Sequence, residues 1–179
     1  MNIYIIVAMA SLGFDAPHSE YVLYNKNGYG YIIGEIRSSM KEITIPKNVK
    51  YLFLNSGGGD LDVALRIAEI VREHGIITVN TDVCYSACVV IYEAGSRRLA
   101  TATATFGFHT PAIYNIHSGH YIDDEIGVNE ARKAMKKSLL FDGMDDDFIE
   151  SWIYSEDVQI ATSKEMKDMY YVDGIVKLN

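Results

Sequence analysis

Three consecutive glycines between an apolar stretch and an amphipathic stretch constrain this chain more than any other feature of its sequence. Residues 51–55 (YLFLN) are short and apolar, as in a buried strand, and residues 61–74 repeat apolar side chains at helical spacing. Asp60 is a typical N-cap for such a helix, and Gly75 is a typical C-cap. The glycines at 57–59 can adopt positive φ and turn their N–H groups toward an anion. The sequence therefore predicts a strand, a glycine turn and a helix in direct succession.

The rest of the chain alternates between strand-like and helix-like segments. Further strands are expected at 29–36, 76–81, 105–109 and 173–178, and further helices at 86–94, 128–141, 145–154 and 163–170. Such alternation predicts the α/β class, with a mainly parallel sheet flanked by helices. The chain has 179 residues and no interior linker, so residues 29–179 are expected to form one domain after an N-terminal segment, 1–28.

The N-terminal segment has features of a weak signal peptide. It contains a short apolar run and an Ala8-Met9-Ala10 that resembles a signal-peptidase site, but it lacks the positively charged region that such peptides need. A cytoplasmic and a periplasmic location therefore both stay open, as does a strand in this segment. No stretch reaches the roughly 20 apolar residues of a membrane-spanning helix, so no membrane span is expected.

Charge is unevenly distributed. The net charge is -8, and residues 123–157 alone hold 11 acidic and 4 basic side chains. Because nucleic-acid binding draws most of its affinity from clustered Lys and Arg, nucleic acid is not an expected partner. The acidic stretch is interpreted as a solvated helical face, with a surface that meets a partner or another subunit as the alternative.

A serine lies between two cysteines in the segment CYSAC. Ser86 either caps the helix that follows or acts as a nucleophile at the positive end of that helix, with the N–H of Ala87 available to a tetrahedral intermediate. Cys84 and Cys88 are too few for a disulfide framework and lack the count and spacing of a zinc site. They are expected to be small core residues, with a redox pair as the alternative.

Histidines occur in two settings. His109 ends an apolar strand (FGFH), where parallel sheets commonly place functional groups. Its position after a glycine turn and a serine segment favours a functional role, because acyl transfer needs an oxyanion hole, a nucleophile and a base together. His117 and His120 lie in an insertion and are expected to be exposed loop residues, because no third ligand accompanies them in a metal-binding pattern.

Taken together, these motifs resemble the proteolytic subunit of Clp protease and its relatives in the ClpP/crotonase fold. The resemblance covers roughly 29–113 and returns at 163–176, and its elements in chain order are residues 55–59, Ser86, Ala94-Gly95 and His109. It implies repeated β-β-α units that form a mainly parallel sheet flanked by helices. The Cys-x-Ser-x-Cys form is most similar to a branch of predicted periplasmic Clp-like proteins.

The resemblance also implies roles for individual residues. Ser86 matches the family's nucleophile, and His109 matches the general base that takes the serine proton and later gives it to the leaving amine. Gly59 and Ala87 match the two backbone donors of the oxyanion hole. These four residues are the expected core of a catalytic site.

Two departures from the family pattern concern the glycine turn and the third catalytic residue. Gly57 replaces the family's usual proline, and together with Gly58 it would shape the turn against the substrate. The position expected for the acid falls on Val158, next to Asp157 and Glu156. A slip of one residue would bring Asp157 to the histidine, and Asp157 is therefore the candidate for the third member of a triad.

The leading hypothesis is a serine peptidase that needs no metal or cofactor. The resemblance implies a peptide or protein substrate and a homo-oligomer, and it leaves any unfoldase or regulator unidentified. Two alternatives stay open. One is a non-catalytic binding or assembly protein with the same fold. The other is a crotonase-type acyl-CoA enzyme, although that chemistry does not need a Ser–His pair and the chain has no basic cluster for the CoA phosphates.

Overall fold

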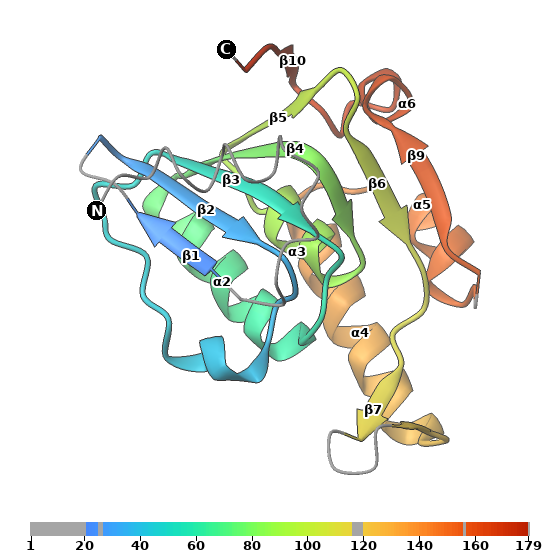
Figure 1. The fold of residues 1–179 in the computed structure, drawn as a ribbon. Helices are drawn as coiled ribbons and strands as arrows, with labels where there is room; N and C mark the ends of the chain where they lie inside the picture. The colour runs from blue at the N-terminus through green and yellow to red at the C-terminus, as the bar shows by residue number, and fades with distance from the viewer. Residues whose placement is uncertain (1–20, 25–26, 116–119, 156, 179) are drawn as a thin grey trace.

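A computed structural model describes residues 21–24, 27–115, 120–155 and 157–178 of the chain. In it, eight strands form one central sheet (Figure 1). The strands are β1 (Tyr21–Tyr24), β2 (Tyr29–Ile33), β3 (Tyr51–Ser56), β4 (Ile77–Tyr85), β5 (Arg97–Thr101), β6 (Thr105–Phe108), β9 (Gln159–Thr162) and β10 (Gly174–Val176). Their order is β1-β2-β3-β4-β5-β10, with β6 paired to β4 and to β9.

Most of these pairings are parallel. Only β1 with β2 and β6 with β9 run antiparallel within this sheet. Burial alternates along β3, whereas β4 has three consecutive buried residues, and both strands contact α3. The mainly parallel α/β architecture that the sequence predicts is confirmed.

Five α-helices and a short 3-10 helix (Ser38–Glu42) accompany the sheet in the described part of the chain. They are α2 (Leu61–His74), α3 (Ala87–Glu93), α4 (Glu125–Phe141), α5 (Asp146–Ile153) and α6 (Ser163–Asp168). Helices α2, α3 and α4 contact one another, and Figure 1 shows α2 and α3 behind the central strands. Within the ranges described, no helix combines the length and the hydropathy needed to cross a membrane.

The bounds of α2 agree with the sequence prediction of 61–74. The carboxylate of Asp60 accepts a hydrogen bond from the N–H of Val63 (3.1 Å), which satisfies a backbone donor that the first helical turn leaves free. Gly75 ends the helix in the left-handed conformation, with φ of 62°. Both signals act locally, which is why the sequence alone locates this helix.

Strand β4 is longer than predicted. The strand expected at 76–81 runs over Ile77–Tyr85, because its first half pairs with β3 and β5, whereas its second half pairs with β6 and keeps one pairing with β3. The buried side chain of Asn80 lies where the partners change: its Nδ2 donates to the carbonyl of Thr105 (2.9 Å), and its Oδ1 accepts from the N–H of Asp82 (3.2 Å). The end of β4 therefore lies beside β6.

Several elements were not predicted. Strands β5 and β9 were missed, as was a hairpin of β7 (Ile113–Asn115) and β8 (His120–Ile122) that projects from the body of the molecule (Figure 1). The C-terminal helix and strand, expected at 163–170 and 173–178, are shorter in the structure. Strand β1 lies in the segment expected to precede the domain, and the signal-like residues of that segment lie outside the described residues.

Candidate active site

Ser86 occupies a sharp turn between β4 and α3. Its φ of 55° and ψ of -126° are unusual for a residue with a side chain, and such a conformation costs about 1–3 kcal/mol. The N–H of Ser86 donates to the carbonyl of Gly107 on β6 (2.7 Å). A serine in a strained turn from strand to helix is an arrangement that presents the hydroxyl as a nucleophile.

The hydroxyl of Ser86 is not used as a helix cap. Ser86 stands at the N-cap position of α3, but its side chain makes no capping hydrogen bond. The interpretation of this residue as a structural cap is therefore wrong. No described residue forms a hydrogen bond with this hydroxyl.

The glycine turn packs directly against Ser86. Gly58 and Gly59 have φ of 96° and 135°. A Cβ on Gly58 would lie 2.8 Å from the Cβ of Ser86 and 3.1 Å from the nitrogen of Ala87, and a Cβ on Gly59 would overlap the carbonyl oxygen of Ile36. Both positions therefore require glycine, for a positive φ and for close approach.

Two backbone donors beside this turn have no partner among the described residues. The N–H of Gly58 is bonded to the hydroxyl of Ser56 (3.1 Å), whereas none of the described residues accepts the N–H of Gly59 or of Ala87. Ala87 is the first residue of α3, so its N–H belongs to the positive end of that helix. Gly57 is exposed, and no atom surrounds its Cβ position within 4 Å.

His109 follows β6 at the same edge of the sheet as Ser86. Strands β4 and β6 are parallel and pair Tyr85 with Gly107, so Ser86 and His109 lie at neighbouring carboxyl ends. The side chain of His109 is half-buried, and its Nδ1 lies 2.6 Å from the carbonyl oxygen of Thr110. When Nδ1 carries the proton and donates it to this carbonyl, Nε2 is left as the basic nitrogen.

Among the described residues, no acid near residue 158 forms a hydrogen bond with His109. Strand β9 pairs Gln159 with Phe108, so Val158 and Asp157 precede it close to the end of β6. Asp157 is exposed, and its carboxylate is bonded to no described residue. Glu156, the other acid at this place, lies outside the described residues.

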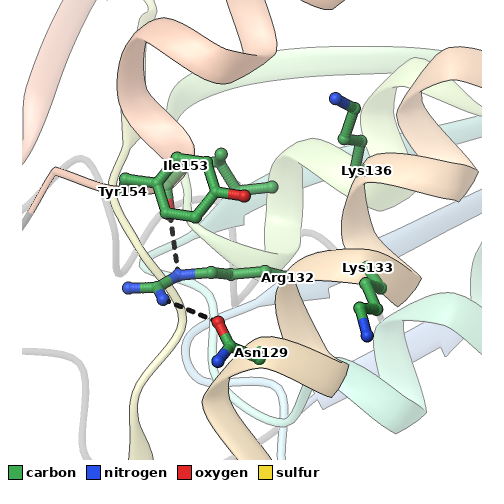
Figure 2. Close-up of a pocket in the computed structure, with 6 residues that line it drawn as sticks. All are labelled: Asn129, Arg132, Lys133, Lys136, Ile153 and Tyr154. Carbon is green, nitrogen blue, oxygen red and sulfur yellow. Dashed lines mark hydrogen bonds between the residues drawn. The ribbon is translucent and has the colours of Figure 1, made fainter. Parts of the chain in front are cut away.

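Arg132 of α4 is a residue near His109 that sequence reasoning missed. Its Nε donates to the hydroxyl of Thr110 (2.8 Å) and to the carbonyl of Ile153 (3.3 Å), and its Nη1 donates to Asn129 (3.1 Å). Its guanidinium lies 4.8 Å from the ring centre of Tyr154 (Figure 2). Arg132 therefore fixes Thr110, whose carbonyl faces the histidine, but in the sequence it is only one base within an acidic stretch.

Arg132 also lines a small cavity between α4 and the end of α5. Figure 2 shows its lining residues, which are Asn129, Arg132, Lys133, Lys136, Ile153 and Tyr154. Lys136 is paired with Asp146 (2.6 Å) and with Glu150 on α5, so part of the positive charge on this side of α4 is neutralised by the acidic stretch.

Cys84 and Cys88 form a disulfide across Ser86. The expectation of two separate core residues is therefore wrong about their chemistry, although both side chains are fully buried as expected. Cys84 is in β4 and Cys88 is in α3, so the bond joins the two elements that meet at Ser86.

A buried acid lies at the other end of α3. Burial raises the pKa of the Glu93 carboxyl to about 8, although the Arg98 guanidinium, 2.7 Å away, acts in the opposite direction. The second oxygen of this carboxyl has no partner among the described residues, and Arg98 also reaches Asp173. This network joins α3 to β5 and to Asp173, which precedes β10, and it lies at the opposite end of α3 from Ser86.

Of the two insertion histidines, His120 was expected in a loop but lies in a strand. His120 belongs to β8, and His117 lies outside the described residues. Among residues 21–24, 27–115, 120–155 and 157–178, no group of three or more His, Cys, Asp or Glu side chains could hold a metal ion.

Comparison with known proteins identifies the fold. No protein-family model and no curated protein matches the sequence. Among solved structures, ClpP1 from Listeria monocytogenes matches with a TM-score of 0.68, and a point mutant of the same protein matches with 0.69. Both are 18% identical to this chain, and each alignment covers 86% of this chain and 93% of the other. The chain therefore has a ClpP-like fold.

Proposed function

We propose that this protein is a serine hydrolase that cleaves peptide bonds. The observation that carries the proposal is the geometry of Ser86, which is held at positive φ between β4 and α3 with a hydroxyl free of hydrogen bonds to described residues. The close approach of Gly58 to Ser86 and Ala87 supports it, because the turn then lies where an oxyanion would form. The ClpP-like fold is consistent with a peptidase.

In the proposed mechanism, the Oγ of Ser86 attacks the carbonyl carbon of the substrate. His109 takes the serine proton on Nε2 and gives it to the leaving amine, and water then hydrolyses the acyl-enzyme by the same steps. The N–H groups of Gly59 and Ala87 would donate to the oxyanion, each contributing about 3–4 kcal/mol of transition-state stabilisation. Gly57 and Gly58 would shape the turn against the substrate.

A catalytic triad has a third group that orients the histidine. We propose that the carbonyl of Thr110 orients the imidazole of His109 here. It already lies within hydrogen-bonding distance of Nδ1. Asp157, which the resemblance to Clp protease implied, stays a candidate whose contribution is measured by the Asp157→Asn variant. A neutral carbonyl stabilises the imidazolium less than a carboxylate does, so the proposed enzyme is expected to be slower than one with a complete triad.

Self-association and a protein substrate are part of the same proposal. Large apolar side chains are exposed on α4, on β9 and after α6, at Ile126, Phe141, Ile160 and Tyr170. Association of subunits would remove such side chains from water, which is consistent with a homo-oligomer. A disulfide persists in oxidising compartments, which supports a relation to periplasmic Clp-like proteins rather than to cytoplasmic ones.

The second candidate is a non-catalytic binding or assembly protein with the same fold. The observation that favours it is the absence of a carboxylate bonded to His109 among the described residues. The acyl-CoA alternative gains no support from any contact described above.

A fluorophosphonate probe distinguishes these functions, because it forms a covalent bond only with an activated serine. We expect the wild-type protein to be labelled and Ser86→Ala to remain unlabelled. Ser151→Ala is the matched control, since Ser151 is exposed on α5 and its hydroxyl bonds only the carbonyl of Phe148. Folded wild-type protein that resists labelling would favour the non-catalytic candidate.

A further inference from the structure

We propose that the Cys84–Cys88 disulfide holds Ser86 and the N–H of Ala87 in their reactive geometry, so that hydrolysis requires the oxidised bond. This inference rests on the proposed function. The disulfide closes a loop of five residues with Ser86 at its centre. Both sulfur-bearing side chains are fully buried, so the bond is part of the core beneath the turn.

The free hydroxyl of Ser86 leaves the start of α3 without a side-chain cap. Helix α3 has only seven residues, and its N-cap side chain makes no hydrogen bond to its first turn. Short helices depend on tertiary anchoring. The bond from Cys84 to Cys88 supplies such an anchor, because it ties the second residue of the helix to the preceding strand.

Cys84, the end of the disulfide that lies in β4, is itself fixed by strand pairing. Cys84 pairs with Phe106 of β6 and with Ser56 of β3. The bond therefore holds the first turn of α3 at a set position relative to the glycine turn, which follows β3, and relative to His109, which follows β6. A residue at positive φ persists only where its surroundings determine its conformation, and the disulfide adds a covalent constraint on both sides of Ser86.

Reduction would remove this constraint without adding charge, at the cost of two added hydrogen atoms and a wider separation of the two sulfurs. A dithiol such as dithiothreitol transfers two electrons and two protons to the bond: the S–S bond breaks, two protein thiols form, and the reagent becomes a cyclic disulfide. The two thiols are small enough to stay in the core. We therefore expect the reduced protein to stay folded but to lose the fixed position of Ser86.

The test compares the rate of fluorophosphonate labelling in oxidised wild type, dithiothreitol-treated wild type and the double variant Cys84→Ala/Cys88→Ala. We expect the latter two to react about tenfold more slowly, because about 1.4 kcal/mol of lost preorganisation corresponds to tenfold in rate. Dithiothreitol should not change the rate of the double variant. A folded double variant that labels within threefold of oxidised wild type would overturn the proposal.

Hydrogen exchange separates this proposal from the proposed function and from general destabilisation. On reduction, amides at the start of α3 (87–90) should exchange faster, while amides of α2 (Leu61–His74) should be unchanged. An equal increase in both helices would show that the bond only stabilises the fold, and would overturn the proposal. If oxidised wild type is not labelled at all, the hydrolase function fails, and the exchange experiment still reports whether the disulfide holds the turn.

Discussion

The Nδ1 of His109 lies 2.6 Å from the carbonyl oxygen of Thr110, the next residue in the chain. Thr110 is held on two sides, by Arg132 at its hydroxyl (2.8 Å) and by the carbonyl of Ser155, to which its N–H donates (2.8 Å). The histidine is therefore oriented by a backbone group that α4 and the segment after α5 keep in place. The predictions below follow from this arrangement and from the geometry of the turn.

Replacing Asp157 with Asn should have little effect on catalysis. The carboxylate is exposed and makes no hydrogen bond to a described residue, so its loss should change the labelling rate with a fluorophosphonate by less than about threefold. Loss of the acid of a complete triad costs about 10⁴-fold in kcat. A drop of that size in folded Asp157→Asn protein would place this carboxylate in the catalytic machinery and contradict the role given to Thr110.

Replacing Arg132 with Met should weaken both the fold and the site. The substitution removes hydrogen bonds to Thr110, Ile153 and Asn129, and bonds of a charged donor are worth about 1.5–3 kcal/mol. We expect a lower midpoint of thermal unfolding and a labelling rate reduced by about tenfold. Lys133→Met removes the same charge from an exposed neighbouring position of α4 and should change neither value. Equal effects of the two variants would show that stability and labelling depend on the positive charge of α4 and not on the hydrogen bond from Arg132 to Thr110.

The glycine turn allows a matched pair of alanine substitutions. Gly59 has φ of 135°, and a Cβ there would overlap the carbonyl of Ile36, so Gly59→Ala should lower the free energy of unfolding by more than about 2 kcal/mol. Gly57→Ala adds a methyl group in open space and should change the free energy of unfolding by less than about 0.5 kcal/mol. Chemical denaturation measures both. Similar losses for the two variants would contradict the described geometry.

The buried Glu93 should make stability depend on pH. Burial raises its pKa from the ordinary 4.5 to about 8, so between these values the folded state binds a proton that the unfolded state has released. The wild type should therefore lose stability as the pH rises from about 5 to about 8, at about 1.4 kcal/mol for each unit over which only the folded state is protonated. Glu93→Gln lacks this proton and should not show the decline.

Denaturation of both proteins at pH 6 and at pH 9 checks this prediction. The difference in unfolding free energy between Glu93→Gln and wild type should shift in favour of the variant at the higher pH. A difference that stays constant would contradict the prediction, because it would show that the ion pair with Arg98 keeps Glu93 ionised in the folded protein at both pH values.

Elements with local signals were predicted best. Helix α2 lies between an N-cap aspartate, Asp60, and a C-cap glycine, Gly75, whose effects reach only a few residues along the chain. Strands β5 and β9 were missed because their pairing partners are distant in the sequence. Strand β5, for example, begins with Arg97 and Arg98, which by composition do not indicate a strand in a sheet.

The sequence by itself determined the order of glycine turn, serine and histidine, and the class of fold that carries them, because these depend on local propensity and spacing. Only the tertiary structure decided that β4 continues to Tyr85 beside β6, and that Cys84 bonds to Cys88 across Ser86. It also decided that a backbone carbonyl, not Asp157, contacts His109. The pairing of β4 with β6, and the contacts of Thr110 with Arg132 and Ser155, join segments that are distant in the sequence, so local propensity does not determine them.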